Sequence, residues 1–212
     1  MKKILILIVL LIFTSGCLYI QDADVEEIIY QVQNSPLTLS NQIRSGYRYQ
    51  LPQGMQVLSV NQHNEIIKAR GFRFFLYIDF VSYYNQTPFV YELSEVSYIS
   101  KNITFNDIPG YLEVNVKEGK YLIEIMFNYA KIEVIVDRRY LNEAIANALI
   151  ILSTIRFNDD IVSSMMSDNM QIFGEEQFNI FETNRGESNF LQHLEDYDYY
   201  DGSTIPDLDR LN

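Results

Sequence analysis

The sequence predicts an α+β fold in which one antiparallel β-sheet of about six to seven strands is flanked by two helices. Between residues 47 and 136, several segments alternate apolar and polar side chains with a period of two, which is typical of strands. The segments 21–34 and 138–156 instead repeat their apolar residues every three or four positions, as amphipathic helices do. Short polar turns join the later strands and favour antiparallel pairing.

The chain begins with a targeting segment. Lys2 and Lys3 precede an apolar run over 4–13, and small residues then lead to Cys17, the only cysteine. This order is typical of a secretory signal. With cysteine at the cleavage position, it resembles the lipobox of bacterial lipoprotein signal peptides. The resemblance implies that residues 1–16 are removed and that Cys17 carries the lipid.

An uncleaved anchor is the alternative interpretation of the same segment. Residues 4–20 carry no charge, and this length is near the lower limit of about 17–25 residues for a spanning helix. Both interpretations place the following domain on the extracytoplasmic face of the cell membrane. In the lipoprotein interpretation, residues 17–22 form the lipidated end and a short tether.

We expect residues 23–182 to form a single α+β domain. Its first helix spans 21–34, with Asp22 or Asp24 as the cap and Pro36 as the terminator. The expected strands are 47–51, 55–60, 65–70, 72–84, 94–105, 111–116, 121–128 and 131–136. The segment 72–84 is apolar on both faces, which predicts a central strand covered on both sides. We expect turns at 107–110, 117–120 and 128–130.

A long helix over 138–156 closes the sheet, with Asp137 as its N-cap. The segment 159–166 suggests a short helix, and 171–173 and 177–181 suggest strands or an extended arm. Residues 183–212 are acidic and poor in apolar residues, so we expect a disordered tail there.

A family resemblance accompanies this layout. The strand start Gly46-Tyr47-x-Tyr49-x-x-Pro52, the long antiparallel sheet and a closing helix that runs into Ser153-Thr154-Ile155-Arg156-Phe157 resemble the PsbP-like family. The resemblance covers about residues 40–157 and implies an α/β/α sandwich. It implies no catalytic residues, because that family has no common active site. A lipoprotein carrier with a curved sheet is a second structural possibility.

Composition and motifs exclude several function classes. The formal charge of −12 argues against nucleic-acid binding, which depends on Lys and Arg. His63 and His193 have no second ligand at zinc spacing, and Asp196, Asp198 and Asp201 do not match a calcium loop. Nucleotide-binding and serine-hydrolase motifs are absent from the sequence. We therefore predict no cofactor, no metal and no enzymatic activity.

Two sets of carboxylates remain as candidate functional groups. Asp79 lies within the apolar pattern of 72–84, and a buried carboxylate there needs hydrogen bonds or a raised pKa. We interpret it as structural and keep it as a functional candidate. Glu113, Glu124 and Glu133 share one face of the predicted sheet. Binding of a hard cation is one interpretation, and we favour the other, in which this face is exposed to solvent.

Function is therefore predicted only by class. We expect a lipid-anchored, non-catalytic binding or accessory module of the cell envelope, held to the membrane through Cys17 and contacting a protein partner. A carrier or sensor with an apolar pocket between sheet and helix is one alternative. A carboxylate-based hydrolase of surface polymers, using groups such as Asp79, is the other. The sequence does not identify a small-molecule ligand.

Overall fold

The computed structural model describes residues 23–35, 39–61 and 63–168, all within one compact unit of the chain. They form an α+β fold with antiparallel sheets, as the sequence predicts. The helices are α2 (Val25–Asn34), α3 (Phe80–Tyr84), the 3-10 helix η2 (Arg138–Tyr140), α4 (Leu141–Ser153) and α5 (Asp159–Asp168). The strands are β1 (Gln42–Ile43), β2 (Tyr47–Tyr49), β3 (Met55–Asn61), β4 (Asn64–Ala69), β5 (Phe72–Ile78), β6 (Ile99–Phe105), β7 (Ile108–Lys117), β8 (Lys120–Phe127), β9 (Ala130–Val136) and β10 (Arg156–Phe157).

The larger sheet has seven strands in the order β3-β4-β5-β9-β8-β7-β6, and every neighbouring pair is antiparallel. Two-residue turns join β6 to β7, β7 to β8 and β8 to β9. In each turn both residues have positive φ, as in the turns that match the twist of a hairpin. These turns are Asn106-Asp107, Glu118-Gly119 and Asn128-Tyr129.

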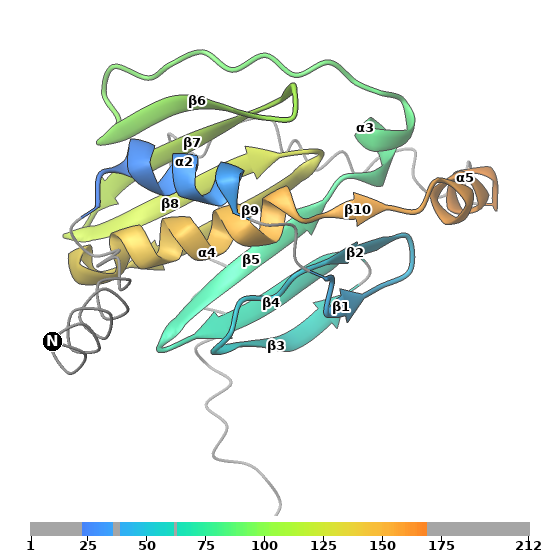
Figure 1. Ribbon diagram of the computed structural model, residues 1–212, viewed down its shortest axis with the longest axis horizontal. Coiled ribbons are helices and arrows are strands. Elements are labelled where there is room, and N and C mark those ends of the chain that lie inside the picture. The colour runs from blue at the N-terminus through green and yellow to red at the C-terminus, as the bar shows by residue number, and fades with distance from the viewer. Residues whose placement is uncertain (1–22, 36–38, 62, 169–212) are drawn as a thin grey trace, which may run out of the picture. The chain divides into compact units, whose positions relative to one another are not determined.

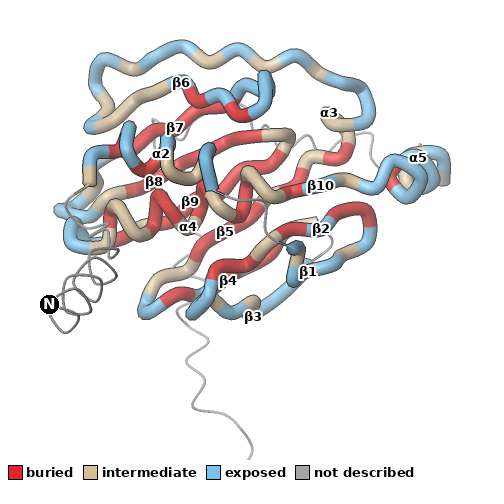
Figure 2. The backbone as a smooth tube through the Cα atoms, in the orientation of Figure 1, coloured by how far each residue is buried: buried red, intermediate tan, exposed pale blue. Residues whose placement is uncertain are grey.

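One face of this sheet packs against α2 and α4, which lie side by side on it (Figure 1). Alternate residues of the central strands point to this face, including Ile125, Ile132 and Val134, and each is fully buried. Ala144 and Ala148 of α4 are buried here, and their small side chains allow the helix to approach the sheet closely. Figure 2 shows that buried residues continue through the central strands.

A three-stranded sheet, β1-β2-β10, lies beside the larger one. Its strand β10 follows α4 directly and pairs with β2 through Phe157 and Tyr47. The ring of Phe80 contacts both Tyr47 and Phe157, with ring centroids 5.9 and 5.8 Å apart. These aromatic contacts connect the start of α3 to the smaller sheet.

Several predicted boundaries are wrong. The strand predicted over 72–84 ends at Ile78, because Asp79 caps a short helix. The strand predicted from residue 94 begins only at Ile99. The turn predicted over 107–110 lies at 106–107, and the long helix ends at Ser153.

Gly110 illustrates why the turn prediction failed. It lies within β7, where an added Cβ would be 2.3 Å from the carbonyl oxygen of Met126. Glycine is therefore required here by the close approach of the neighbouring strand rather than by a turn.

Cys17, the tether, the arm over 171–181, His193 and the acidic tail lie outside the described residues. Within the part of the chain that the structure describes, no helix is long and apolar enough to span a membrane.

Candidate functional site

The face of the larger sheet that points away from α4 carries a row of three glutamates. Glu113 on β7 is directly opposite Glu124 on β8, and Glu124 is directly opposite Glu133 on β9. Residues paired in this way have Cβ atoms about 4.5–5.5 Å apart. We call these three residues the carboxylate row. The prediction that they face solvent is wrong, since their exposed fractions are 0, 0 and 3%.

Lys131 supplies positive charge to the row. Its Nζ atom lies 2.7 Å from Oε1 of Glu133 and 3.7 Å from Oε1 of Glu124. Lys131 is itself 5% exposed, so these charges are desolvated together. Buried charges of this kind persist in proteins only when they are paired and hydrogen-bonded. The ammonium of Lys131 thus compensates part of the row's negative charge.

The opposite end of the row is held by the connection between α3 and β6. Ser97 Oγ donates a hydrogen bond of 2.9 Å to Glu113, and the hydroxyl of Tyr91 donates to the other oxygen of the same carboxylate. Asn115 donates a third bond, of 3.0 Å, from β7 itself. Glu113 is therefore fixed by side chains of two segments.

Aromatic rings cover this end of the row. The rings of Tyr91 and Tyr111 are stacked, with centroids 4.5 Å apart and an interplanar angle of 9°, and Phe89 stacks on both. The Tyr111 hydroxyl is fully buried and has no hydrogen-bond partner in the described structure. Burial, together with the charges of Glu124, Glu133 and Glu113, raises the pKa of Tyr111 well above its usual value. Burial and Glu133 raise the pKa of Tyr77 in the same way.

The geometry of the row limits its chemistry. A glycosidase needs two carboxylates that face a polymer across a cleft. Here Glu113 is saturated by hydrogen bonds, Glu133 is paired with Lys131, and all three glutamates are inaccessible to solvent. Among the described residues, no group of three or more His, Cys, Asp or Glu side chains is arranged to hold a metal ion. The row thus serves as an internal polar core.

A second buried carboxylate, Glu65 of β4, connects the two sheets. Its oxygens accept hydrogen bonds of 2.6 and 2.8 Å from the hydroxyls of Tyr47 and Tyr49, and of 2.9 Å from Arg44. Burial, followed by the charge of Glu65, raises the pKa of both tyrosines. With 1% exposure and three donors, Glu65 is a structural group.

Asp79 is also engaged in local structure. Its carboxylate accepts hydrogen bonds from the backbone N–H of Ser82 at 2.8 Å and from the Ser82 hydroxyl at 2.6 Å, which is the arrangement of a helix N-cap. The structure does not bring Asp79 together with the carboxylate row. His63 packs edge-on against Phe80 at 4.6 Å, and burial lowers its pKa.

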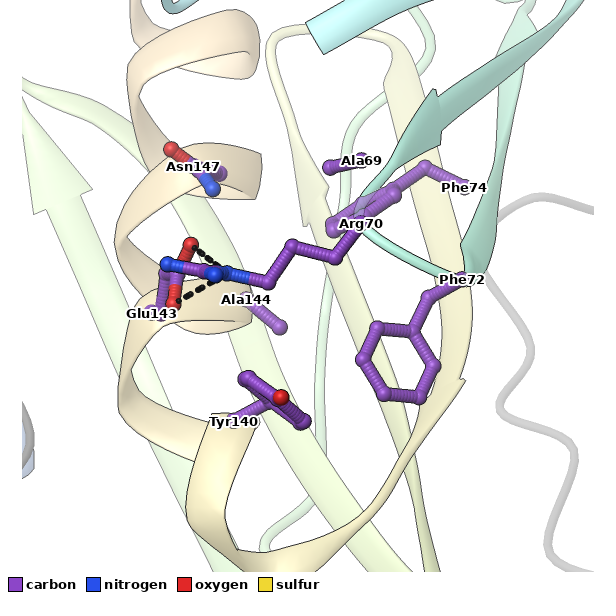
Figure 3. A pocket seen from close by; sticks show the side chains of 8 residues that line it. All are labelled: Ala69, Arg70, Phe72, Phe74, Tyr140, Glu143, Ala144 and Asn147. Carbon is purple, nitrogen blue, oxygen red and sulfur yellow. Dashed lines mark hydrogen bonds and ion pairs between the residues drawn. The ribbon is translucent and has the colours of Figure 1, made fainter. Parts of the chain in front are cut away.

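The interface between α4 and the sheet contains little free space. At its end, Arg70, Phe72, Tyr140 and Glu143 surround a cavity of only about 10 Å³ (Figure 3). Arg70 Nε donates to both oxygens of Glu143, at 2.8 and 3.1 Å, and crosses the opening. Ligand pockets are typically about 300–1,000 Å³. This cavity is therefore too small for an apolar ligand.

A larger groove, of about 620 Å³, is open to solvent beside the start of α2. Lys101 pairs with Glu26 on its wall, and Arg138 lies over the rings of Tyr98 and Tyr121. The charged and hydroxyl groups of this groove therefore already have partners within the protein. Its polar lining also differs from that of a pocket for an apolar ligand.

No known protein family, curated protein or solved structure matches this chain. The site is therefore described from its own geometry. The sequence pattern identified the three glutamates as one face but not their burial. It missed Glu65 and Tyr91, whose hydrogen-bond partners lie 16 to 22 residues away along the chain, and Tyr111, whose ring stacks on that of Tyr91.

Proposed function

We propose that the chain is a lipid-anchored protein of the extracytoplasmic face of the cell membrane, where it acts as a non-catalytic binding module. The anchor rests on the signal-like order of residues 1–16 and on Cys17. The non-catalytic role rests on one observation, which is that the buried carboxylates of the domain are engaged within the fold. Glu65 and Glu113 each accept three hydrogen bonds, and Glu133 pairs with Lys131.

The small volume of the space between α4 and the sheet favours a binding module rather than a carrier. A carrier would need a cavity of several hundred cubic ångströms there, whereas the cavity found has about 10 Å³. We therefore expect the partner to bind on the outer surface. Because the chain is strongly acidic, we expect that partner to be a protein rather than a nucleic acid.

Metabolic labelling tests the anchor. The chain should incorporate labelled palmitate, and the Cys17→Ser variant should remain an unprocessed, unlabelled precursor. Label that persists in the variant would refute the lipoprotein proposal. A Ser15→Thr variant, which keeps Cys17, controls for general effects on export.

Ligand and substrate assays test the non-catalytic role. The purified protein should neither bind fatty acids with micromolar affinity nor release sugars from cell-wall polymers. Hydrolysis that disappears in Asp79→Asn, while the variant keeps the parent's circular dichroism spectrum, would establish the hydrolase alternative. Saturable fatty-acid binding would establish the carrier alternative.

We also propose kinship with the PsbP-like family. It rests on the strand start at Gly46, Tyr47, Tyr49 and Pro52 and on the closing helix before Arg156. In the described residues, α2 and α4 share one face of the sheet. A crystal structure of the full chain tests this proposal, because an α/β/α sandwich requires a helical layer on the other face as well.

A further inference from the structure

The connection between α3 and β6 contains a segment, residues 89–97, whose side chains follow a three-residue period. Tyr91, Ser94 and Ser97 are half-buried and point inward. Val90, Leu93 and Val96 point outward, with exposed fractions of 83, 58 and 90%. Glu92 and Glu95, between them, are also exposed. The 89–97 segment therefore has an inner row, an outer apolar row and an outer acidic row.

The inner row fixes the segment on the sheet. The Tyr91 hydroxyl contacts Ser100 Oγ at 2.7 Å and also donates to Glu113. The backbone N–H of Ser94 donates to Ser100 Oγ at 2.8 Å, and the Ser97 hydroxyl donates to Glu113 and contacts Ser94 Oγ at 2.8 Å. A connection without helix or strand (Figure 1) is thus held at three positions by hydrogen bonds to Ser100 of β6 and Glu113 of β7.

We propose that the outer side of the 89–97 segment is the docking surface for a partner protein that presents Lys or Arg side chains beside apolar ones. This inference rests on the binding role proposed above and gives it a location. Single exposed apolar residues are common on protein surfaces, but exposed apolar patches rimmed by polar residues mark interaction sites, and this apolar row lies beside two exposed glutamates. Because the segment is already fixed, a partner would order few additional groups on binding.

Charge selects the class of partner. Glu92 and Glu95 flank the apolar row, and the whole chain carries a formal charge of −12. Such a surface attracts a basic partner and repels both a second copy of itself and anionic lipid headgroups. The occupant that fits is therefore a basic protein surface rather than a homodimer or the membrane.

Peptide binding tests the recognition chemistry. The full chain is placed in zwitterionic nanodiscs and exposed to a peptide of alternating Lys and Val, with empty nanodiscs as the reference. The triple variant Val90→Ser/Leu93→Ser/Val96→Ser should bind the peptide about tenfold more weakly, and Glu92→Gln/Glu95→Gln should reduce both affinity and salt dependence. The matched variant Leu39→Ser/Ile43→Ser removes apolar residues that are 93 and 76% exposed elsewhere, and should bind as the parent does.

Equal binding by the parent, the triple variant and the matched variant would overturn the proposal. So would a dimer in sedimentation equilibrium that the triple variant abolishes, because the surface would then serve a second copy. Stronger binding to vesicles of anionic lipid than to the peptide would assign the surface to the membrane and also overturn it.

Crosslinking in the cell envelope separates this inference from the proposed function. A photoreactive residue replaces Val96 or, as the matched control, Ile43. We expect an adduct only from position 96, and its loss when Glu92→Lys/Glu95→Lys is added. An adduct only from position 43 would retain the binding role and overturn the 89–97 surface. Absence of adducts from both positions would overturn both proposals.

Discussion

Over its central strands the seven-stranded sheet is buried on both faces, but the two faces differ in chemistry. The face under α2 and α4 consists of apolar side chains such as Ile125, Ile132 and Val134. The other face carries the carboxylate row, Lys131 and stacked tyrosines among a few apolar residues. Apolar packing tolerates rearrangement, whereas a buried polar network is stabilising only while its members remain paired. The second face should therefore be the more sensitive to single substitutions and the more readily rescued by double ones.

The largest effect is expected from separating Glu133 and Lys131. Glu133→Leu leaves a buried ammonium without its 2.7 Å partner, and should lower the free energy of unfolding by about 3–5 kcal/mol. The double variant Lys131→Met/Glu133→Leu should recover part of that loss, because the ammonium is removed together with its closest carboxylate, while Glu124 loses its 3.7 Å contact with Lys131. Urea denaturation of Glu133→Leu, Lys131→Met and the double variant measures the coupling between the two residues. If the losses of the two single variants simply add in the double variant, the pair is not a coupled unit.

The apolar face should respond differently. Ile125→Ala deletes fully buried methylene and methyl groups under α4, and should lower the free energy of unfolding by about 2–5 kcal/mol. The volume-conserving control Ile125→Met should cost less than about 1.5 kcal/mol. Thermal and urea unfolding provide the measurement. Equal losses in the two variants would mean that packing volume does not determine the stability of this face.

Tyr91 and Tyr111 provide a matched pair on the polar face, because their rings stack on each other. Within the described structure, the Tyr91 hydroxyl is hydrogen-bonded to Glu113, whereas the Tyr111 hydroxyl has no hydrogen-bond partner. Tyr91→Phe should lower the free energy of unfolding by about 1.5–3 kcal/mol, the range for hydrogen bonds to charged groups. Tyr111→Phe should leave stability unchanged or slightly raised. If Tyr111→Phe lowered the free energy of unfolding as much as Tyr91→Phe, the Tyr111 hydroxyl would have to make a stabilising hydrogen bond, which would contradict its description as unpartnered.

At neutral pH the raised tyrosine pKa values have no effect, but alkaline conditions should reveal them. In the folded protein, burial and neighbouring glutamates favour the neutral phenols of Tyr47, Tyr49, Tyr77 and Tyr111. Their contribution to stability is complete below the unfolded pKa of about 10 and is lost as pH rises above it. Tyrosinate absorbance should therefore develop together with loss of circular dichroism. Tyr77→Phe/Tyr111→Phe should unfold at higher pH than the parent.

The comparison also explains which parts of the fold the sequence could predict. A period of two identified β8 and β9 and separated their two faces correctly. The period of two could not distinguish a solvent-exposed polar face from a buried polar face, because apolar and polar residues alternate along the strand in the same way in both cases. Burial of Glu124 depends on what packs over it, and local pattern contains no information about that.

Two other errors have separate physical causes. The residues of α3 are mostly aromatic or β-branched and favour a strand, yet the side chain of Asp79 accepts a hydrogen bond from the backbone N–H of Ser82 in the first turn of a helix. Glu65 lies 16 and 18 residues from its tyrosine partners, at a contact that exists only after the two sheets meet. The sequence contains no periodic signal for a contact of this kind.

The tight turns around β8 have a consequence for the order of folding. Because two residues close each of these hairpins, β7, β8 and β9 can pair within about 1–10 μs. In contrast, the pairing of Ile78 with Ala130 must close a much longer loop. The three glutamates should therefore meet while water still surrounds them, and Glu113 should lose its water when Tyr91 and Ser97 of the 89–97 segment bind it. Changes at Tyr91 should accordingly accelerate unfolding and leave the refolding rate nearly unaltered.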